Sequence, residues 1–163
     1  MKKIVAMLLC LAMALTCLAG CGAKSSSGKL TAYVIAEKGD TYSLGLANNF
    51  KTAFEELGGK VVMETFPTNT TNFSDYLQKA LDNNADVIFA PNSTTVAANL
   101  LKNADDLGVE CPILAGDTWE SSVILDAIKG TDLEVYCSTF FDENDSSSTA
   151  ASDFVKGFKK WLN

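Results

Sequence analysis

The sequence predicts an α/β fold, a doubly wound five-stranded parallel sheet of order 2-1-3-4-5 flanked by helices. From residue 30 onward, short runs rich in β-branched and other apolar residues alternate with segments whose apolar residues recur at helical spacing. Glycines and helix-capping residues separate these segments. Because right-handed crossovers place helices on both faces of a parallel sheet, the alternation predicts one layered α/β domain.

Five apolar, β-rich runs are the expected strands, at 31–36, 60–65, 86–90, 111–115 and 133–139. A helix is expected after each of them. The first helix should end at Gly58-Gly59, and its inward face is expected to be Leu46, Phe50, Ala53, Phe54 and Leu57.

The later helices carry similar apolar stripes. The second is expected to bury Phe73, Tyr76, Leu77, Ala80 and Leu81, behind a cap at Asn72 or Thr71. The third is expected to bury Val96, Leu100, Leu101, Ala104 and Leu107, with Ser93, Thr94 and Thr95 available as caps. A short fourth helix covers 121–128. The fifth, 149–162, is expected to turn inward Ala151, Phe154, Val155, Phe158 and Leu162.

The N-terminus is typical of an exported lipoprotein. Lys2 and Lys3 precede an apolar run at 4–17, and Leu18-Ala19-Gly20-Cys21 supplies small residues before a cysteine. The run is shorter than the roughly 20 residues of a membrane span. Leu-Ala-Gly-Cys resembles the lipobox of bacterial lipoproteins, which implies that Cys21 is acylated. We therefore expect a signal peptide at 1–20, a flexible tether at 21–29 and a single α/β ligand-binding lobe at 30–163, held outside the cytoplasm on the bacterial cell membrane.

Composition narrows the possible functions. The formal net charge is −7, so nucleic acid is not an expected partner. The chain contains no histidine and no arginine. It therefore lacks the commonest general base and the usual bidentate carboxylate clamp, and no metal-ligand spacing or nucleophile-base pair is present. We expect a protein that is not an enzyme, with no catalytic residues, metal or cofactor.

Two cysteines lie in the expected sheet. Cys111 opens the fourth strand, and Cys137 lies several residues into the fifth. The offset predicts α-carbons too far apart for a disulfide, so both are expected to be buried free thiols.

The strand order predicts a ligand site at the carboxyl edge of the sheet, where the order reverses between strands 1 and 3. The loops at 37–42, 91–95 and 115–119 meet there. The candidate ligand-binding residues are Tyr42, Ser93, Thr94, Asp117 and Trp119. Aromatic rings, short hydroxyls and one carboxylate suit a small polar molecule.

Each candidate residue also has a purely structural explanation. Tyr42 can pack on the first turn of its helix, and Ser93 and Thr94 can cap a helix without contacting a ligand. Asp117 can accept hydrogen bonds from backbone amides of its own loop. Trp119 can be buried against the fourth helix.

Several motifs resemble one family. They are Tyr42-x-x-Gly45-Leu46-Ala47 at a helix start, Gly58-Gly59 at its end, Thr71-Asn72-Phe73-Ser74, and Gly116-Asp117-x-Trp119 after the fourth strand. Together they resemble the C-terminal lobe of the leucine/isoleucine/valine-binding family of type 1 periplasmic binding proteins, over about residues 30 to 163.

The resemblance implies a substrate-binding protein of an ABC transporter that delivers amino acids to a permease. It implies that Tyr42 lines the cleft, that Ser93 and Thr94 lie in a polar loop, and that Asp117 pairs the ligand ammonium. Trp119 matches a frequent aromatic of that loop, with a weaker claim to ligand contact.

In that family an N-terminal lobe precedes the strand that corresponds to 31–36, and it holds the ligand carboxylate. We expect this chain to be truncated to one lobe, as a fragment. The alternatives are binding of a sugar or nucleoside, which the same residues permit, or a non-transport sensor or interaction module.

Overall fold

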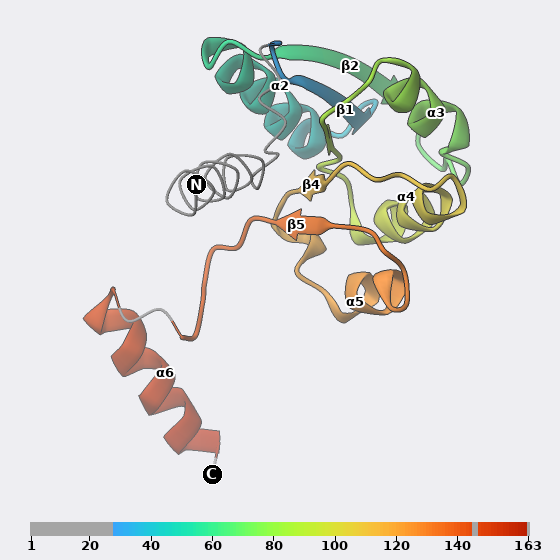
Figure 1. Cartoon of the computed structure of the whole chain (residues 1–163). Coiled ribbons are helices and arrows are strands. Elements are labelled where there is room, and N and C mark those ends of the chain that lie inside the picture. Colours follow the sequence, from blue (N-terminus) through green and yellow to red (C-terminus); the bar gives the residue numbers. More distant parts are fainter. Residues whose placement is uncertain (1–27, 145–146, 163) are drawn as a thin grey trace, which may run out of the picture.

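A five-stranded parallel sheet forms the centre of the protein (Figure 1). The computed structural model describes residues 28–144 and 147–162. The strands are β1 Thr31–Glu37, β2 Lys60–Phe66, β3 Val87–Phe89, β4 Ile113–Ala115 and β5 Val135–Cys137. Their order is β2-β1-β3-β4-β5 and every pair is parallel. The predicted fold class and strand order are confirmed.

Helices cover the two faces of the sheet unequally. The described helices are α2 Thr41–Glu56, α3 Ser74–Asp82, α4 Thr94–Asp106, the 3-10 turn η2 Asp117–Trp119, α5 Ser122–Ile128 and α6 Thr149–Leu162. On one face α3, α4 and α5 bury Leu77, Leu100 and Ile124 against the strands. On the other face α2 packs through Ala47 and Phe50.

Alternation along the strands supplies both cores. In β1, Tyr33 and Ile35 face α3 and α4, whereas Val34 and Ala36 face α2. The stripes predicted for α3 and α4 are confirmed, since Phe73, Leu77, Ala80, Leu100, Leu101 and Ala104 are fully buried.

The stripe predicted for α2 is partly wrong. The helix buries Ser43 and Ala47, while Ala53 is exposed and Leu57 is 88% exposed just beyond the last turn. Small side chains at 43 and 47 let the helix approach the sheet closely. The contact face includes Leu46 and Phe50 as predicted, but it is centred on residues 43 and 47, so Ala53 and Leu57 lie outside it. Asp40 caps the helix by accepting hydrogen bonds from the backbone N–H groups of Tyr42 and Ser43 at 3.1 and 3.3 Å.

The inward packing predicted for α6 is also wrong. No residue of α6 is buried, and the helix lies apart from the sheet (Figure 1). The segment after β5 runs away from the sheet and contacts α6 itself, through the rings of Phe141 and Phe154 and an ion pair of Glu143 with Lys159. Residues 149–162 form a helix as predicted, but the apolar side of this helix does not pack on the sheet.

Cys111 and Cys137 are free thiols, as predicted. Their predicted burial fails, because Cys111 is half-buried and Cys137 is exposed. Cys137 is exposed because β5 is short and lies at the sheet edge, and Cys111 lies in the bend before β4 rather than in the strand.

Among the described residues, none of the helices has the length and apolar character needed to cross a membrane. The predicted signal peptide and Cys21 lie outside the described residues.

Candidate functional site

The candidate site lies where β1, β3 and β4 end. Three elements begin at this edge: α2 after β1, α4 after β3, and η2 after β4. Because β1 pairs with both β2 and β3, the chain leaves β1 and β3 toward opposite sides of the sheet, which is the arrangement that places ligand sites of open α/β sheets at this edge.

A buried asparagine holds the edge together. The side chain of Asn92, 1% exposed, donates from Nδ2 to the carbonyl of Ile35 at 3.0 Å. Its Oδ1 accepts a hydrogen bond from the Ser43 hydroxyl at 3.1 Å, and that hydroxyl accepts one from the N–H of Glu37 at 3.2 Å. Asn92 thus ties the ends of β1 and β3 to the first turn of α2.

The same residue also fixes the loop after β4. The backbone carbonyl of Asn92 accepts hydrogen bonds from the Thr118 hydroxyl at 2.8 Å and from the Trp119 indole N–H at 2.9 Å. Thr94 closes the contact by donating its hydroxyl to the carbonyl of Thr118 at 2.7 Å. These bonds set the position of Asp117, which precedes Thr118 in η2.

Tyr42 and Asp117 meet above this framework. The Tyr42 hydroxyl donates a hydrogen bond to Oδ1 of Asp117, which joins the start of α2 to η2. This bond is the main reason that the pKa of Tyr42 is raised above its usual value. Tyr42 is 44% exposed and Asp117 is half-buried, so both are accessible to solvent at the carboxyl edge of the sheet. The predicted convergence of these two residues is confirmed.

The remaining candidates take different positions. Ser93 is the N-cap residue of α4, but its side chain makes no capping hydrogen bond and is exposed. The hydroxyl of Thr94 donates its hydrogen bond to the carbonyl of Thr118. Trp119 is 2% exposed and packs in the core, as its structural explanation predicted.

A polar hollow lies next to Ser93. Its volume is about 310 Å³. Its walls carry mainly hydroxyl and amide side chains together with one carboxylate, and the lining residues are Glu37, Thr68, Asn69, Thr70, Thr71, Ser93, Thr95, Val96 and Asn99. The edge therefore offers carboxylates, hydroxyls and amides to a ligand.

Sequence reasoning placed Asn92 in one of the loops at the site but did not predict its bracing role, and it did not identify Ser43. Both are polar and fully or almost fully buried, which requires that their hydrogen bonds be satisfied internally. The only sequence signal was that each lies shortly after the end of a strand, Asn92 in the loop after β3 and Ser43 in the first turn of the helix after β1. Across the described residues, no group of acidic or cysteine side chains could hold a metal ion.

These features define the lobe of a solute-binding protein: a doubly wound sheet with a small polar site at the carboxyl edge. A family model described as periplasmic binding protein matches residues 14–161. The chain therefore belongs to the periplasmic binding protein family, whose members bind solutes for ABC transporters and are not enzymes. Family membership implies an extracytoplasmic location. No curated protein sequence matches the chain significantly.

Solved structures of this class resemble the chain. The leucine-binding protein LivK of Thermotoga maritima is 27% identical, with a TM-score of 0.72, over 85% of this chain and 40% of that one. LivJ of Streptococcus pneumoniae, solved with isoleucine, is 22% identical, with a TM-score of 0.66, over 80% and 37%. A substrate-binding protein of Desulfitobacterium hafniense, solved with Leu, is 24% identical, with a TM-score of 0.61, over 82% and 38%.

The chain thus spans about 40% of the length of the solved structures that it matches. The resemblance to the leucine-binding family is confirmed, and this coverage fits one lobe. The two structures below 25% identity support the fold alone.

Proposed function

We propose that the chain binds a small amino acid at the carboxyl edge of its sheet and serves an ABC uptake system, with an ABC permease as its partner. The observation that carries this proposal is the pairing of Tyr42 with Asp117 at the strand-order reversal. The similarity to a leucine-binding protein from Thermotoga maritima supports the same ligand class.

In the proposed complex, the Asp117 carboxylate accepts the ligand ammonium and the ring of Tyr42 forms a wall for the carbon skeleton. Both groups are accessible to solvent at the carboxyl edge, and Asn92 and Thr94 fix the loop that carries Asp117. The exposed hydroxyl of Ser93 is free of capping and can orient the ligand. Trp119 contributes by bracing this loop from inside the core rather than by touching the ligand.

Binding by this one edge is expected to be weak. A hydrated carboxylate attracts an ammonium by about 1 kcal/mol at contact distance. A binder that encloses its ligand with micromolar affinity gains about −8 kcal/mol, and half of that corresponds to roughly millimolar binding. We therefore propose millimolar affinity for the chain alone.

NMR chemical-shift titration of the full chain with leucine and isoleucine tests the proposal. We expect saturable shifts around Tyr42 and Asp117, and about fivefold weaker binding for Asp117→Asn, which is the affinity equivalent of about 1 kcal/mol. Asp126→Asn is the matched control, because Asp126 is exposed on α5 and away from this edge. Equal affinities for both variants would contradict the assignment of Asp117.

A sugar is the second candidate ligand. The hollow beside Ser93 favours it, because hydroxyl and amide side chains pair well with a polyhydroxyl ligand. Titration with ribose and glucose in the same spectra separates the candidates. Shifts at Thr70 and Asn99 with a sugar, and none at Asp117 with an amino acid, would favour the second.

We also propose that residues 1–20 are a signal peptide, that 21–29 are a tether, and that Cys21 carries a lipid which anchors the lobe of 30–163. The support is the Leu18-Ala19-Gly20-Cys21 sequence. Cys21→Ala should lose incorporation of labelled fatty acid and leave the membrane fraction, whereas Cys137→Ala should keep both. A Cys21→Ala protein that still takes up label would exclude this anchor.

A further inference from the structure

Gly116 lies between the end of β4 and Asp117, where the chain passes close to α2. Its backbone is extended, with φ −80° and ψ −178°, a conformation that any residue adopts. A Cβ atom on residue 116 would lie 2.9 Å from Cδ1 of Leu46 on α2, whereas carbon atoms in contact are normally about 3.5 to 4.0 Å apart. The glycine is therefore needed here for space and not for its backbone conformation.

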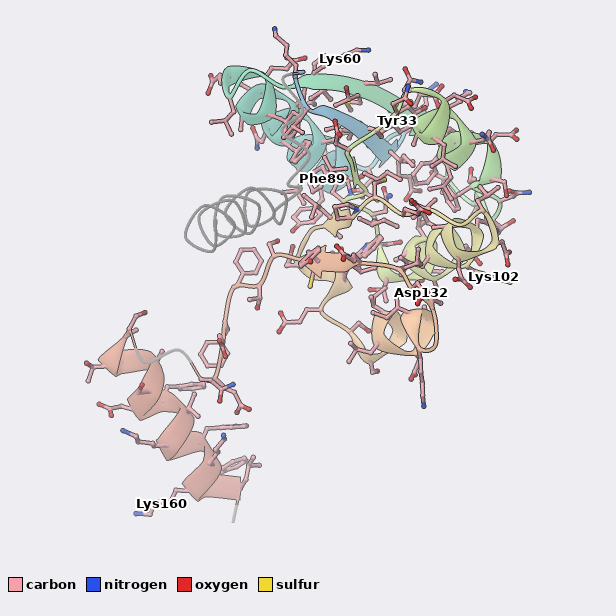
Figure 2. The ribbon with its side chains drawn as sticks, viewed as in Figure 1. Tyr33, Lys60, Phe89, Lys102, Asp132 and Lys160 are labelled. Atoms are coloured by element: carbon pink, nitrogen blue, oxygen red, sulfur yellow. The ribbon has the colours of Figure 1, made fainter. Side chains whose placement is uncertain are left out.

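Leu46 is held in a packed environment. It is half-buried and packs against the cluster that contains Val34 and Phe89, and Leu114 packs against the same cluster. Val34, Phe89 and Leu114 are neighbours in one row across β1, β3 and β4, which Tyr136 continues on β5. Figure 2 labels Phe89 beside α2. A side chain on residue 116 would therefore push against a packed leucine and, through it, against α2.

The contact between Leu46 and Gly116 lies next to the pair of Tyr42 and Asp117. Tyr42 precedes Leu46 by four residues on α2, so the two share one side of the helix, and Asp117 directly follows Gly116. On its other side η2 is fixed, because Thr118 is hydrogen-bonded to the segment between β3 and α4 through its carbonyl and its hydroxyl. The spacing of α2 and η2 at Gly116 thus decides whether the Tyr42 hydroxyl reaches Oδ1 of Asp117.

We propose that Gly116 is a positioning residue of the ligand site: because it carries no side chain, α2 lies close enough to η2 for Tyr42 to bond Asp117. The bond orients the carboxylate and keeps the ring of Tyr42 beside it, as the proposed amino-acid complex requires. The effect on ligand binding rests on the proposed function, whereas the effect on the pairing of Tyr42 with Asp117 needs no ligand.

Titration of the Tyr42 phenol measures the pairing in the full chain without a ligand. NMR of isotope-labelled tyrosine follows it, with Tyr42→Phe to assign the signal. The bond to Asp117 holds the pKa of Tyr42 above its usual value, and Asp117→Asn gives the pKa in the absence of the carboxylate. Gly116→Val should lose most of the pKa difference between wild type and Asp117→Asn. Gly45→Ala, on the exposed side of α2, is the matched control and should keep the wild-type pKa, because a Cβ there meets no atom within 4 Å.

Leu46→Ala gives a stricter test, because it removes the side chain that a residue at 116 would meet. Combined with Gly116→Val it should restore the raised pKa of Tyr42, and alone it should leave that pKa raised. Circular dichroism checks that each variant folds, and Gly116→Ala, which adds one carbon, replaces Gly116→Val if the valine variant does not fold. A wild-type pKa in the Gly116 variant, or the same loss with and without Leu46→Ala, would overturn the proposal.

Titration of the same variants with leucine connects the pairing to binding. Gly116→Val should bind leucine up to about fivefold more weakly than wild type, the loss expected for Asp117→Asn, and Gly45→Ala should bind it as wild type does. A wild type that binds no amino acid would contradict the proposed function, while the Tyr42 titration would still test the role of Gly116. A Gly116→Val protein that loses the raised pKa but binds leucine as tightly as wild type would overturn the positioning role in binding.

Discussion

The two faces of the sheet are built from the same alternating strands but have different environments. On one face, α3, α4 and α5 together span the sheet, and Ile35, Ile88 and Ile113 are fully buried. On the other face α2 covers β1 and its neighbours, and the row that starts at buried Val34 ends at exposed Tyr136. Burial of a strand residue is therefore decided by the helix above it, not by its own hydrophobicity.

The largest expected effect comes from the row on the α2 face. Phe89→Ala should lower the free energy of unfolding by about 3 to 5 kcal/mol, because it removes a buried ring that stacks on Phe50. Tyr136→Ala, in the same row, should cost no more than about 0.5 kcal/mol. Urea denaturation measures both losses of stability. Similar losses for the two variants would show that the face is covered evenly.

An intermediate effect is expected at the carboxyl edge. Asn92→Leu removes the donor to Ile35 and the acceptor for Ser43, and should cost about 1 to 3 kcal/mol because buried partners lose their hydrogen bonds. Asn49→Leu, on the exposed side of α2, is the matched control and should be close to neutral. Urea denaturation measures the loss, and ligand titration should show weaker binding for Asn92→Leu alone. An Asn92→Leu variant as stable as wild type would contradict the role of Asn92 in holding β1, β3 and α2 together.

The smallest effect is expected at the rim of the α3 face. Hydrogen bonds from Lys79 and from the Tyr33 hydroxyl, both at 2.7 Å, lower the pKa of the Glu64 carboxyl, the Lys79 bond contributing most. Because the folded-state pKa is lowered, this stabilisation is present above about pH 4.3, the ordinary pKa of glutamate, and is lost as the pH falls through the folded-state value.

Glu64→Gln should therefore be slightly less stable than wild type at pH 7, and the difference should shrink as the pH is lowered to 3. The effect is small because Lys79 is solvent-exposed. Thermal denaturation at the two pH values measures it, with Glu56→Gln on the exposed end of α2 as the control. A difference as large at pH 3 as at pH 7 would mean that packing, not charge, is responsible.

Most of the fold could be predicted from local patterns. The runs around Val34, Val62 and Ile88 indicate strands because they are short, rich in β-branched residues and bounded by turn residues. The apolar residues of α3 recur at helical spacing, which indicates a helix. The errors lie where burial depends on distant residues. Leu57 and Phe154 have the right period for an inward position, but no element of the described sheet lies opposite them.

The sequence by itself determined the α/β class, the strand order and the edge at which Tyr42 and Asp117 meet, because chirality and crossover rules leave few topologies for alternating strands and helices. Only the tertiary structure decided which polar groups hold that edge together. Asn92 and Ser43 became bonded because three chain segments converge on them. The exposure of Tyr136 and the detached position of α6 were likewise decided in three dimensions, since a hydrophobic pattern specifies a face to be covered but not what covers it.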